Sequence, residues 1–285
     1  MDRESEDFVK ESPEADLEQI EVSLLTEAIY RRWGYDFRDY APASLKRRIL
    51  RIVELEGVAS ISALQERLLR DAPCMQRFID QILVSVTSMF RDPGFYRAFR
   101  AEAIRLLKQH SSLRIWHAGC ASGEEVYSMA IVLQQEGLLE HSRIYATDLD
   151  QIALNTAKNG IYPLSKMKEF TENYQASGGE TAFSEYYQAG HGHAAMRADL
   201  SKNIVWAQHN LVTDASFNEF HLIVCRNVLI YFNTELQARV HRLLYESLAD
   251  DGVLVLGRQE TLQMTPHESC FRAIDSREKI FQRVT

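Results

Sequence analysis

The segment LRIWHAGCASGEEVYSMAIVLQQ, residues 113–135, decides the fold class of this chain. It begins as an apolar, β-type run and continues as a helical pattern, with a glycine-containing turn between the two. Such a unit is typical of α/β sheets, which bind nucleotide-like ligands outside the carboxyl ends of their strands. Gly119 and Gly123 would let the backbone approach a ligand of this kind closely.

Two acidic residues, Glu124 and Glu125, stand at the start of the helix that follows this turn. The N-terminus of a helix normally attracts phosphate through its free N–H groups. Carboxylates at this place repel phosphate, so the turn favours a ligand that carries positive charge. A turn that serves only the fold is the alternative, since a glycine turn after a strand is weak evidence by itself.

Further strands and helices alternate from residue 93 to the C-terminus. This alternation predicts an α/β fold with a doubly wound, mostly parallel sheet over residues 93–285. The other β-type runs are RIYATD (143–148), NIVWAQHN (203–210), HLIVCRN (221–227), GVLVLG (252–257) and KIFQRVT (279–285), and the helical patterns are DQIALNTAKNG (150–160) and TELQARVHRLLYESLADDG (234–252).

The first third of the chain has a different rhythm. Residues 1–15 are acidic and poor in apolar side chains, which predicts a disordered tail. Residues 16–92 predict a small all-helical domain, because the apolar positions recur at helical spacing and no strand-like alternation occurs. The clearest apolar positions are Leu17, Ile20, Leu24 and Ile29, followed by Leu45, Ile49 and Ile52, with Gly57 as the residue that ends the second helix.

Residues 163–203 fit neither pattern, and they contain the polar motifs SGGE and GHGH. A long irregular stretch inside an α/β domain is usually an insertion with its own task. His191 and His193 could bind a metal ion from a strand, but no cysteine or second histidine pair completes a site. We therefore interpret them as loop histidines and expect no metal.

The composition excludes some classes of function. The 285 residues carry a formal net charge of -8, which argues against a general nucleic-acid binder. The four cysteines form no Cys-x-x-Cys pair, and the N-terminus has no apolar signal-peptide core. We expect a cytoplasmic protein with reduced thiols and no direct membrane insertion, and a monomer, since no segment gives an oligomerisation signal.

Asp148 closes the second predicted strand, where an acidic residue is the usual partner of ribose hydroxyls. The alternative is the N-cap of the next helix, a position that Asp150 could fill instead. Cys225 and Arg226 end the fourth strand and are expected to face the same crevice. Tyr231 follows them and is either a site residue or a core residue whose hydroxyl needs a partner.

Five short segments together resemble the CheR-type chemotaxis receptor methyltransferases. The family pattern has N-x-T-x-F-F-R-[DE], G-[ST]-G-E-E-P-Y-S, A-[ST]-D-[IL]-D, an N-L pair and C-R-N-V-x-I-Y-F. The order and the spacing agree with the family. The matching segments of this chain are SVTSMFRD (85–92), CASGEEVYS (120–128), ATDLD (146–150), HNL (209–211) and CRNVLIYF (225–232).

The resemblance implies a Rossmann-like methyltransferase sheet with a small β-subdomain as the insertion, and S-adenosylmethionine as the cofactor, with S-adenosylhomocysteine as its product. Arg91 and Tyr231 would face the reacting methyl group. The same resemblance assigns cofactor contacts to Ser85, Thr87, Arg91, Gly119, Glu125, Asp148, Asn210, Leu211, Cys225 and Arg226.

This chain departs from the family pattern at several of these segments. Ser85 replaces the usual Asn, Met89 a usual Phe, and Val126 a common Pro. Gly257-Arg258-Gln259-Glu260 stands where the family often has G-H-S-E. The insertion is also shorter than in members that grip a receptor's C-terminal pentapeptide, so we expect no dependence on a pentapeptide.

The resemblance further implies methylation of glutamate carboxylates on methyl-accepting chemoreceptors. Lys46, Arg47, Arg48 and Arg51 cluster on one predicted helix, opposite Leu45, Ile49 and Ile52. We interpret this cluster as a docking surface for the acidic receptor helices, with a solvated helix face as the alternative. The competing functions are methylation of another protein, a small molecule or a nucleic acid, and a regulatory scaffold that binds the cofactor without turnover.

Overall fold

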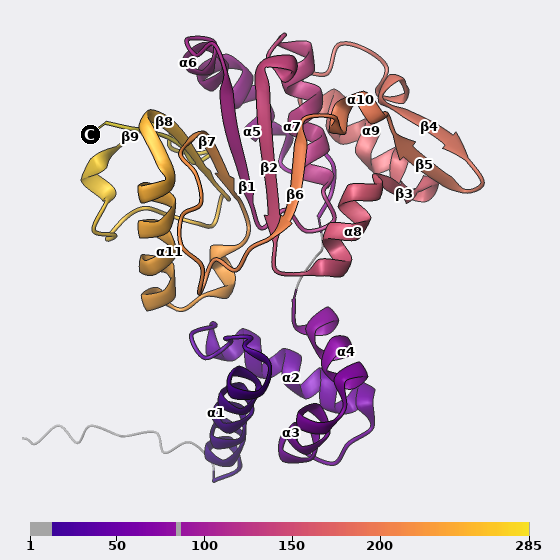
Figure 1. Ribbon diagram of the computed structural model, residues 1–285, viewed down its shortest axis with the longest axis vertical. Coiled ribbons are helices and arrows are strands. Elements are labelled where there is room, and N and C mark those ends of the chain that lie inside the picture. Colours follow the sequence, from indigo (N-terminus) through magenta and orange to yellow (C-terminus); the bar gives the residue numbers. More distant parts are fainter. Residues whose placement is uncertain (1–12, 84–86, 285) are drawn as a thin grey trace, which may run out of the picture. The chain divides into compact units, whose positions relative to one another are not determined.

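The structure, a computed structural model, describes residues 13–83 and 87–284 (Figure 1). Its contacts divide the chain into two compact units, residues 1–82 and 83–285. The boundary expected at 92/93 therefore comes too late in the chain, because Met89 and Phe90 are buried in the core of the second unit. The tail expected at 1–15 lies outside the described residues up to position 12, and helix α1 begins at Pro13.

The first unit consists of four helices in its described part: α1 (Pro13–Trp33), α2 (Pro42–Glu56), α3 (Ile61–Arg70) and α4 (Ala72–Ile82). On α2 the side chains of Leu45, Ile49 and Ile52 are buried, as the periodicity predicts. Gly57 ends this helix in the left-handed conformation, with a φ of 64°.

The buried face of α1 differs from the one that the sequence suggested. Leu17, Ile20 and Leu24 are each more than half exposed, whereas Leu25 and Ile29 are buried. Both sets recur at helical spacing, so periodicity alone did not distinguish the face that packs onto α3.

A seven-stranded sheet forms the centre of the second unit, in the order β6-β2-β1-β7-β8-β10-β9. The first five strands of this order pair in parallel, and β10 pairs antiparallel with both β8 and β9. The predicted doubly wound, mostly parallel sheet is thus confirmed. The strands are β1 (Leu113–Ala118), β2 (Ser142–Asp148), β6 (Ile204–Gln208), β7 (Phe220–Cys225), β8 (Leu248–Leu256), β9 (Phe271–Asp275) and β10 (Ile280–Arg283).

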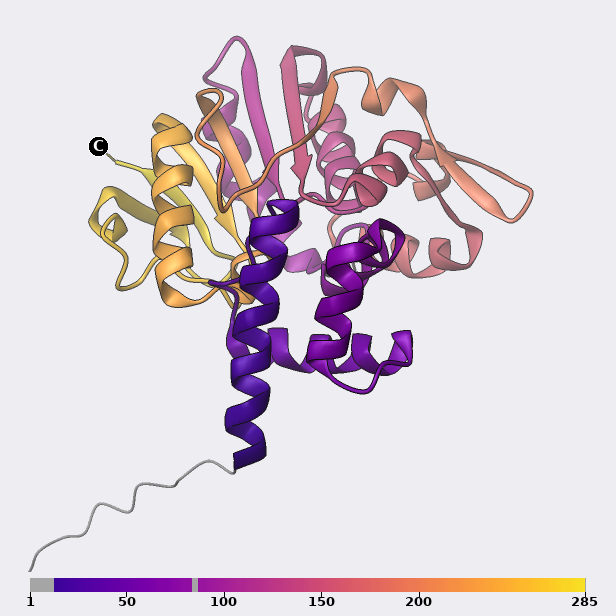
Figure 2. The same ribbon diagram turned by 60° about the horizontal axis from the view of Figure 1, so that its bottom comes forward.

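Helices cover both faces of this sheet, with α7 and α11 on opposite sides (Figures 1 and 2). Alternate residues of β1 serve the two faces: Ile115 joins the core beneath α7, and Trp116 packs against Phe217 and Phe220 on the other side. The helices are α5 (Pro93–Ala98), a π-helical turn (Phe99–Ala103), α6 (Ile104–Leu107), α7 (Glu124–Gln135), α8 (Gln151–Asn159), α10 (Ala198–Ser201) and α11 (Thr234–Ser247).

The insertion holds more regular structure than its polar sequence indicates. It forms a three-stranded antiparallel sheet in the order β3-β5-β4, which confirms the small β-subdomain. It also contains helix α9 (Met167–Ala176), which the sequence did not predict, because Met167, Phe170 and Tyr174 bury only one narrow face. The strands are β3 (Ile161–Pro163), β4 (Tyr187–Gly190) and β5 (His193–Met196).

Two further expectations need correction at the C-terminal end. The helix predicted over 234–252 ends at Ser247, because Leu248 already pairs with Phe220 as the first residue of β8. Strand β9 was not predicted, since its residues are mostly half exposed and lack an apolar run. No helix among the described residues is long and apolar enough to cross a membrane.

A buried histidine on α11 should make the fold sensitive to acid. His241 is 2% exposed, and burial lowers its pKa from 6.5 to about 4. The folded protein therefore binds this proton less well than the unfolded chain, so stability is full above pH 6.5 and falls as the pH drops toward 4. We expect His241→Phe to remove up to about 3 kcal/mol of this loss, measured by urea unfolding at several pH values.

The matched control for this variant is His141→Phe, which changes an exposed histidine of the same unit. It should leave the slope of unfolding free energy against pH unchanged. An unaltered slope in His241→Phe would show that other groups cause the acid sensitivity.

Candidate cofactor and methyl-transfer site

The turn after β1 is built to come close to neighbouring chain segments. The N–H groups of Gly119 and Cys120 both donate to the carbonyl oxygen of Thr147, at 2.8 and 2.9 Å. Gly119 has a φ of 80°, and an added Cβ would overlap the side chain of Val228. Gly123 has a φ of 89°, and its Cβ would lie 2.7 Å from that of Ala157. Glycine is required at both places for conformation and for space.

Asp148 lies at the end of β2, where its carboxylate accepts the N–H groups of Ala121 (2.7 Å) and Asp150 (2.9 Å). Asp150, rather than Asp148, is the N-cap of α8, since it accepts the N–H groups of Ile152 and Ala153. The alternative role of Asp148, as the N-cap of α8, is therefore excluded. Burial raises the pKa of Asp148, and the remaining lone pairs of its oxygens can accept hydroxyl donors.

A buried network of charges crosses the end of the sheet from β1 to α5. Glu125 faces His117 Nδ1 at 3.0 Å and accepts a hydrogen bond from Arg226 at 3.1 Å. The other end of the Arg226 guanidinium donates to Asp92 at 2.8 Å. Burial acts to raise the pKa of Glu125, but His117 and Arg226 lower it overall. The carboxylate of Glu125 is thus ionised and already paired.

This network changes the interpretation of two expected cofactor contacts. The Arg226 side chain is 1% exposed and lies 4.3 Å from the ring centroid of Phe95, so it does not line an open crevice. Glu125 retains 16% side-chain exposure, which leaves one edge of its carboxylate accessible to a ligand.

Arg91 occupies a different environment from Arg226. Its side chain is exposed, and it makes no hydrogen bond or ion pair with the described residues. The residues on both sides are held in the fold: Phe90 is buried, and Asp92 is the N-cap residue of α5. Arg91 therefore presents five unengaged donors to whatever approaches this loop.

The other predicted residues are distributed around the same carboxyl edge of the sheet. Asn210 and Leu211 follow β6, and Asn210 accepts the N–H of Val212 at 2.9 Å. Cys225 ends β7 fully buried, and burial raises the pKa of its thiol. Tyr231 is half buried at the end of a 3-10 turn (Leu229–Tyr231). Thr87 is half buried in the Arg91 loop, and Ser85 lies outside the described residues.

Glu260 has a structural role that its motif, Gly257-Arg258-Gln259-Glu260, did not predict. It is 4% exposed, and its two oxygens accept four backbone N–H groups: those of Asn227, Val228, Leu229 and Gly257. Burial raises its pKa, while these donors act in the opposite direction. Glu260 therefore organises the loop between Arg226 and Tyr231, a contact over more than thirty positions that no local pattern reveals.

The four basic residues of α2 do not share one role. Lys46 forms a 2.6 Å ion pair with Glu18, and Arg48 donates to the carbonyl oxygen of Ile82 at 2.7 Å. Arg47 and Arg51 are exposed one helical turn apart, and they line a shallow surface pocket of about 610 Å³ together with Leu50. Arg47 and Arg51 are thus the two of these residues whose side chains have no hydrogen-bond or ion-pair partner among the described residues.

The family comparisons agree with this division of the chain. Residues 85–280 match the model of the CheR methyltransferase SAM binding domain, and residues 20–83 match the CheR methyltransferase all-alpha domain. The chain belongs to the CheR methyltransferase family. It is an S-adenosylmethionine-dependent methyltransferase, and S-adenosylmethionine is its cofactor.

Several relatives carry related names. The Pseudomonas putida protein named "Putative methyltransferase Cher3" is 46% identical over 93% of this chain and 97% of its own length. A "Chemotaxis protein methyltransferase" of Listeria monocytogenes is 33% identical over 87% and 92%, respectively. One of Salmonella typhimurium with the same name is 26% identical over 87% and 86%.

The residues at the carboxyl edge fit the cofactor of this CheR family member. S-adenosylmethionine carries a sulfonium and an ammonium, and the carboxylates of Glu125 and Asp148 lie beside the close-approach turn at Gly119.

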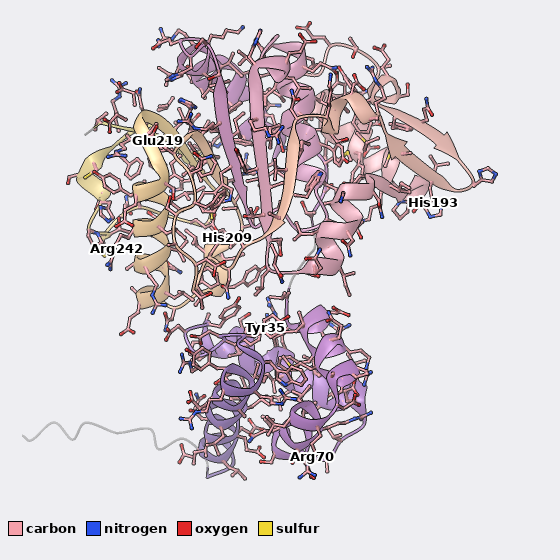
Figure 3. The ribbon with its side chains drawn as sticks, in the orientation of Figure 1. Tyr35, Arg70, His193, His209, Glu219 and Arg242 are labelled. Carbon is pink, nitrogen blue, oxygen red and sulfur yellow. The ribbon has the colours of Figure 1, made fainter. Side chains whose placement is uncertain are left out.

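No group of three or more metal-ligating side chains occurs in the part of the chain that the structure describes. His193 instead contacts the carbonyl oxygen of His191 at an exposed hairpin tip (Figure 3).

Proposed function

We propose that this chain transfers the methyl group of S-adenosylmethionine to glutamate side chains of chemoreceptors and forms glutamyl methyl esters. The observation that carries this proposal is the unengaged Arg91 guanidinium at the carboxyl edge of a cofactor-binding sheet. The planar fork of a guanidinium matches a carboxylate in two-point geometry. The names of the Listeria and Salmonella relatives support a chemotaxis substrate.

The reaction places few demands on proton transfer. S-adenosylmethionine supplies an activated methyl group when it is bound. A glutamate with an ordinary pKa of about 4.3 is ionised at neutral pH, so its oxygen can attack without a general base. The residues of this chain contribute orientation instead, because a well-aligned attack removes much of the barrier.

Arg91 and Tyr231 are the residues that we assign to this orientation. Arg91 donates to both oxygens of the substrate carboxylate in two-point geometry, and the attacking oxygen keeps its second lone pair for the methyl group. Tyr231 fixes the other side of the carboxylate through its hydroxyl group. Too strong a pairing would weaken the nucleophile, so two positioned donors fit better than a buried ion pair.

The cofactor contacts follow the carboxyl edge. Asp148 binds the ribose hydroxyls, and the open edge of Glu125 faces the ammonium group. Asn210 and Leu211 border the adenine, while Gly119 and Cys225 shape the floor. Thr87 and Ser85 approach the methionine end, and Arg226 contributes indirectly through its partners.

Arg47 and Arg51 form the docking surface for the acidic receptor helices. Reversing both charges, as Arg47→Glu with Arg51→Glu, is expected to raise the KM for receptor by about 10-fold or more, because two attractive contacts become repulsive. The Kd of S-adenosylmethionine should stay unchanged. Initial rates at several receptor concentrations, at two salt concentrations, measure this effect.

Arg70→Glu is the matched control for these reversals, since Arg70 is an exposed cation of the same unit on α3. It should leave the KM for receptor within about twofold of the parent. An equal rise in both variants would indicate a general charge effect in place of a docking surface.

The direct test of the proposal is methyl transfer from radiolabelled S-adenosylmethionine to receptor-containing membranes. Label on a receptor band that leaves as methanol in mild base identifies a glutamyl ester. Cofactor binding without labelled receptor would contradict the proposal and favour another substrate.

Removal of the receptor's C-terminal pentapeptide should leave the rate unchanged, because the insertion is short.

A further inference from the structure

The backbone beside Arg91 adopts an unusual conformation. Phe90 has a φ of 53° and Asp92 a φ of 57°, so left-handed residues flank Arg91 on both sides. A bulky aromatic residue seldom adopts this conformation, because its side chain is then strained against the backbone. Strain of this kind persists only where the surrounding structure fixes it, and it is frequent at functional sites.

Contacts on the N-terminal side fix Phe90. Its N–H donates to Ser128 Oγ of α7 at 2.9 Å, and Ser128 is fully buried. The Phe90 ring packs against Tyr96 and Tyr174, with centroid separations of 5.0 and 5.1 Å. The residue before Arg91 is therefore held by a hydrogen bond and by aromatic packing.

Arg226 fixes the C-terminal side of the loop. One end of its guanidinium donates to the Asp92 carboxylate at 2.8 Å and lies 3.5 Å from the Arg91 carbonyl oxygen. Its other end is held by Glu125, at 3.1 Å. Asp92 also lies 3.9 Å from Arg258, whose own partner is Glu278 at 2.7 Å.

Burying a guanidinium is unfavourable unless opposite charges and hydrogen bonds compensate for the lost hydration. The two partners that compensate Arg226 are Glu125 and Asp92. Arg226 therefore connects Glu125, a proposed cofactor contact, to the residue that follows Arg91. We propose that Asp92 and Arg226 are positioning residues, which fix the strained loop and so aim Arg91 at the methyl-accepting carboxylate. This inference rests on the proposed role of Arg91.

Asp92 gives the sharper test, because two substitutions keep its left-handed conformation. Glycine adopts a φ of 57° without strain but removes the carboxylate, whereas asparagine tolerates it and keeps an oxygen for Arg226. We expect Asp92→Gly to lower kcat by about 100-fold, since a displacement of 1 Å has an effect of this size. Asp92→Asn should recover most of the rate, and the Kd of S-adenosylmethionine should change little in both.

A double-mutant cycle with Arg91→Ala tests whether Asp92 acts through Arg91. The effect of Asp92→Gly should fall from about 100-fold to nearly onefold in the Arg91→Ala background, measured with labelled cofactor. Hydrogen exchange should also speed up in the peptide that covers residues 87–95. Thermal unfolding checks that each variant folds, and Arg226→Lys, which removes the two-ended fork between Glu125 and Asp92 but keeps the charge, replaces Asp92→Gly in the cycle if the latter does not fold.

The outcomes separate this inference from the function on which it rests. A slow Arg91→Ala enzyme combined with an unimpaired Asp92→Gly enzyme overturns the positioning role alone. Full additivity in the cycle also overturns it, since Asp92 would then act independently of Arg91. An Arg91→Ala enzyme with the parent's rate contradicts the proposed role of Arg91 itself.

Discussion

Replacing Arg91 by alanine is expected to lower the rate of methyl transfer by about 100-fold to 1,000-fold, the range seen when one preorganised donor is removed from a reaction site. The side chain is exposed and has no partner among the described residues, so its removal leaves no buried group unpaired. The free energy of unfolding should therefore change little. The rate of methyl transfer falls because the acceptor carboxylate is no longer oriented.

Arg91 is assigned to both the acceptor carboxylate and the cofactor. Saturating kinetics with receptor measure its contribution to turnover, and calorimetric binding of S-adenosylmethionine measures its contribution to cofactor affinity. We expect the main loss in kcat, with a change in cofactor Kd of at most about 10-fold. Arg105→Ala is the control, because Arg105 is an exposed arginine of the same unit on α6. If Arg91→Ala retains both cofactor affinity and turnover, the assignment of Arg91 is wrong.

The second large effect is expected for Glu260→Gln. Each oxygen accepts two of the four backbone N–H groups, so an amide nitrogen in place of one oxygen would leave two of them facing a donor. Each buried N–H left unpaired costs about 1–3 kcal/mol. We expect the free energy of unfolding to fall by about 3 kcal/mol, measured by urea denaturation.

Turnover should fall together with stability in this variant, because the loop that Glu260 holds connects Arg226 to Tyr231. Asn227 in this loop has a φ of 61°, a conformation that the carboxylate helps to fix. Glu246→Gln, an exposed position on α11, is the control and should change neither quantity. Parent-like stability in Glu260→Gln would show that the loop holds its shape without this anion.

The α/β class and the positions of the main strands along the chain could be predicted from the sequence, because buried strands and amphipathic helices are local patterns. The same holds for Gly57 and Gly160, which end α2 and α8 with positive φ. Helix α9 and strand β9 escaped prediction, since their apolar faces are narrow and tertiary contacts stabilise them. The end of α11 depended on the pairing of Leu248 with β7.

The sequence by itself determined the family and the cofactor, and it predicted the site residues, because short motifs at fixed spacing carry this information. Only the tertiary structure decided which of these residues are free to act. Arg91 and Arg226 are both arginines in family motifs, but one is exposed and the other is buried between Glu125 and Asp92. The physical reason is that the pairing of a charge depends on residues distant in the sequence, which only folding brings within hydrogen-bonding distance.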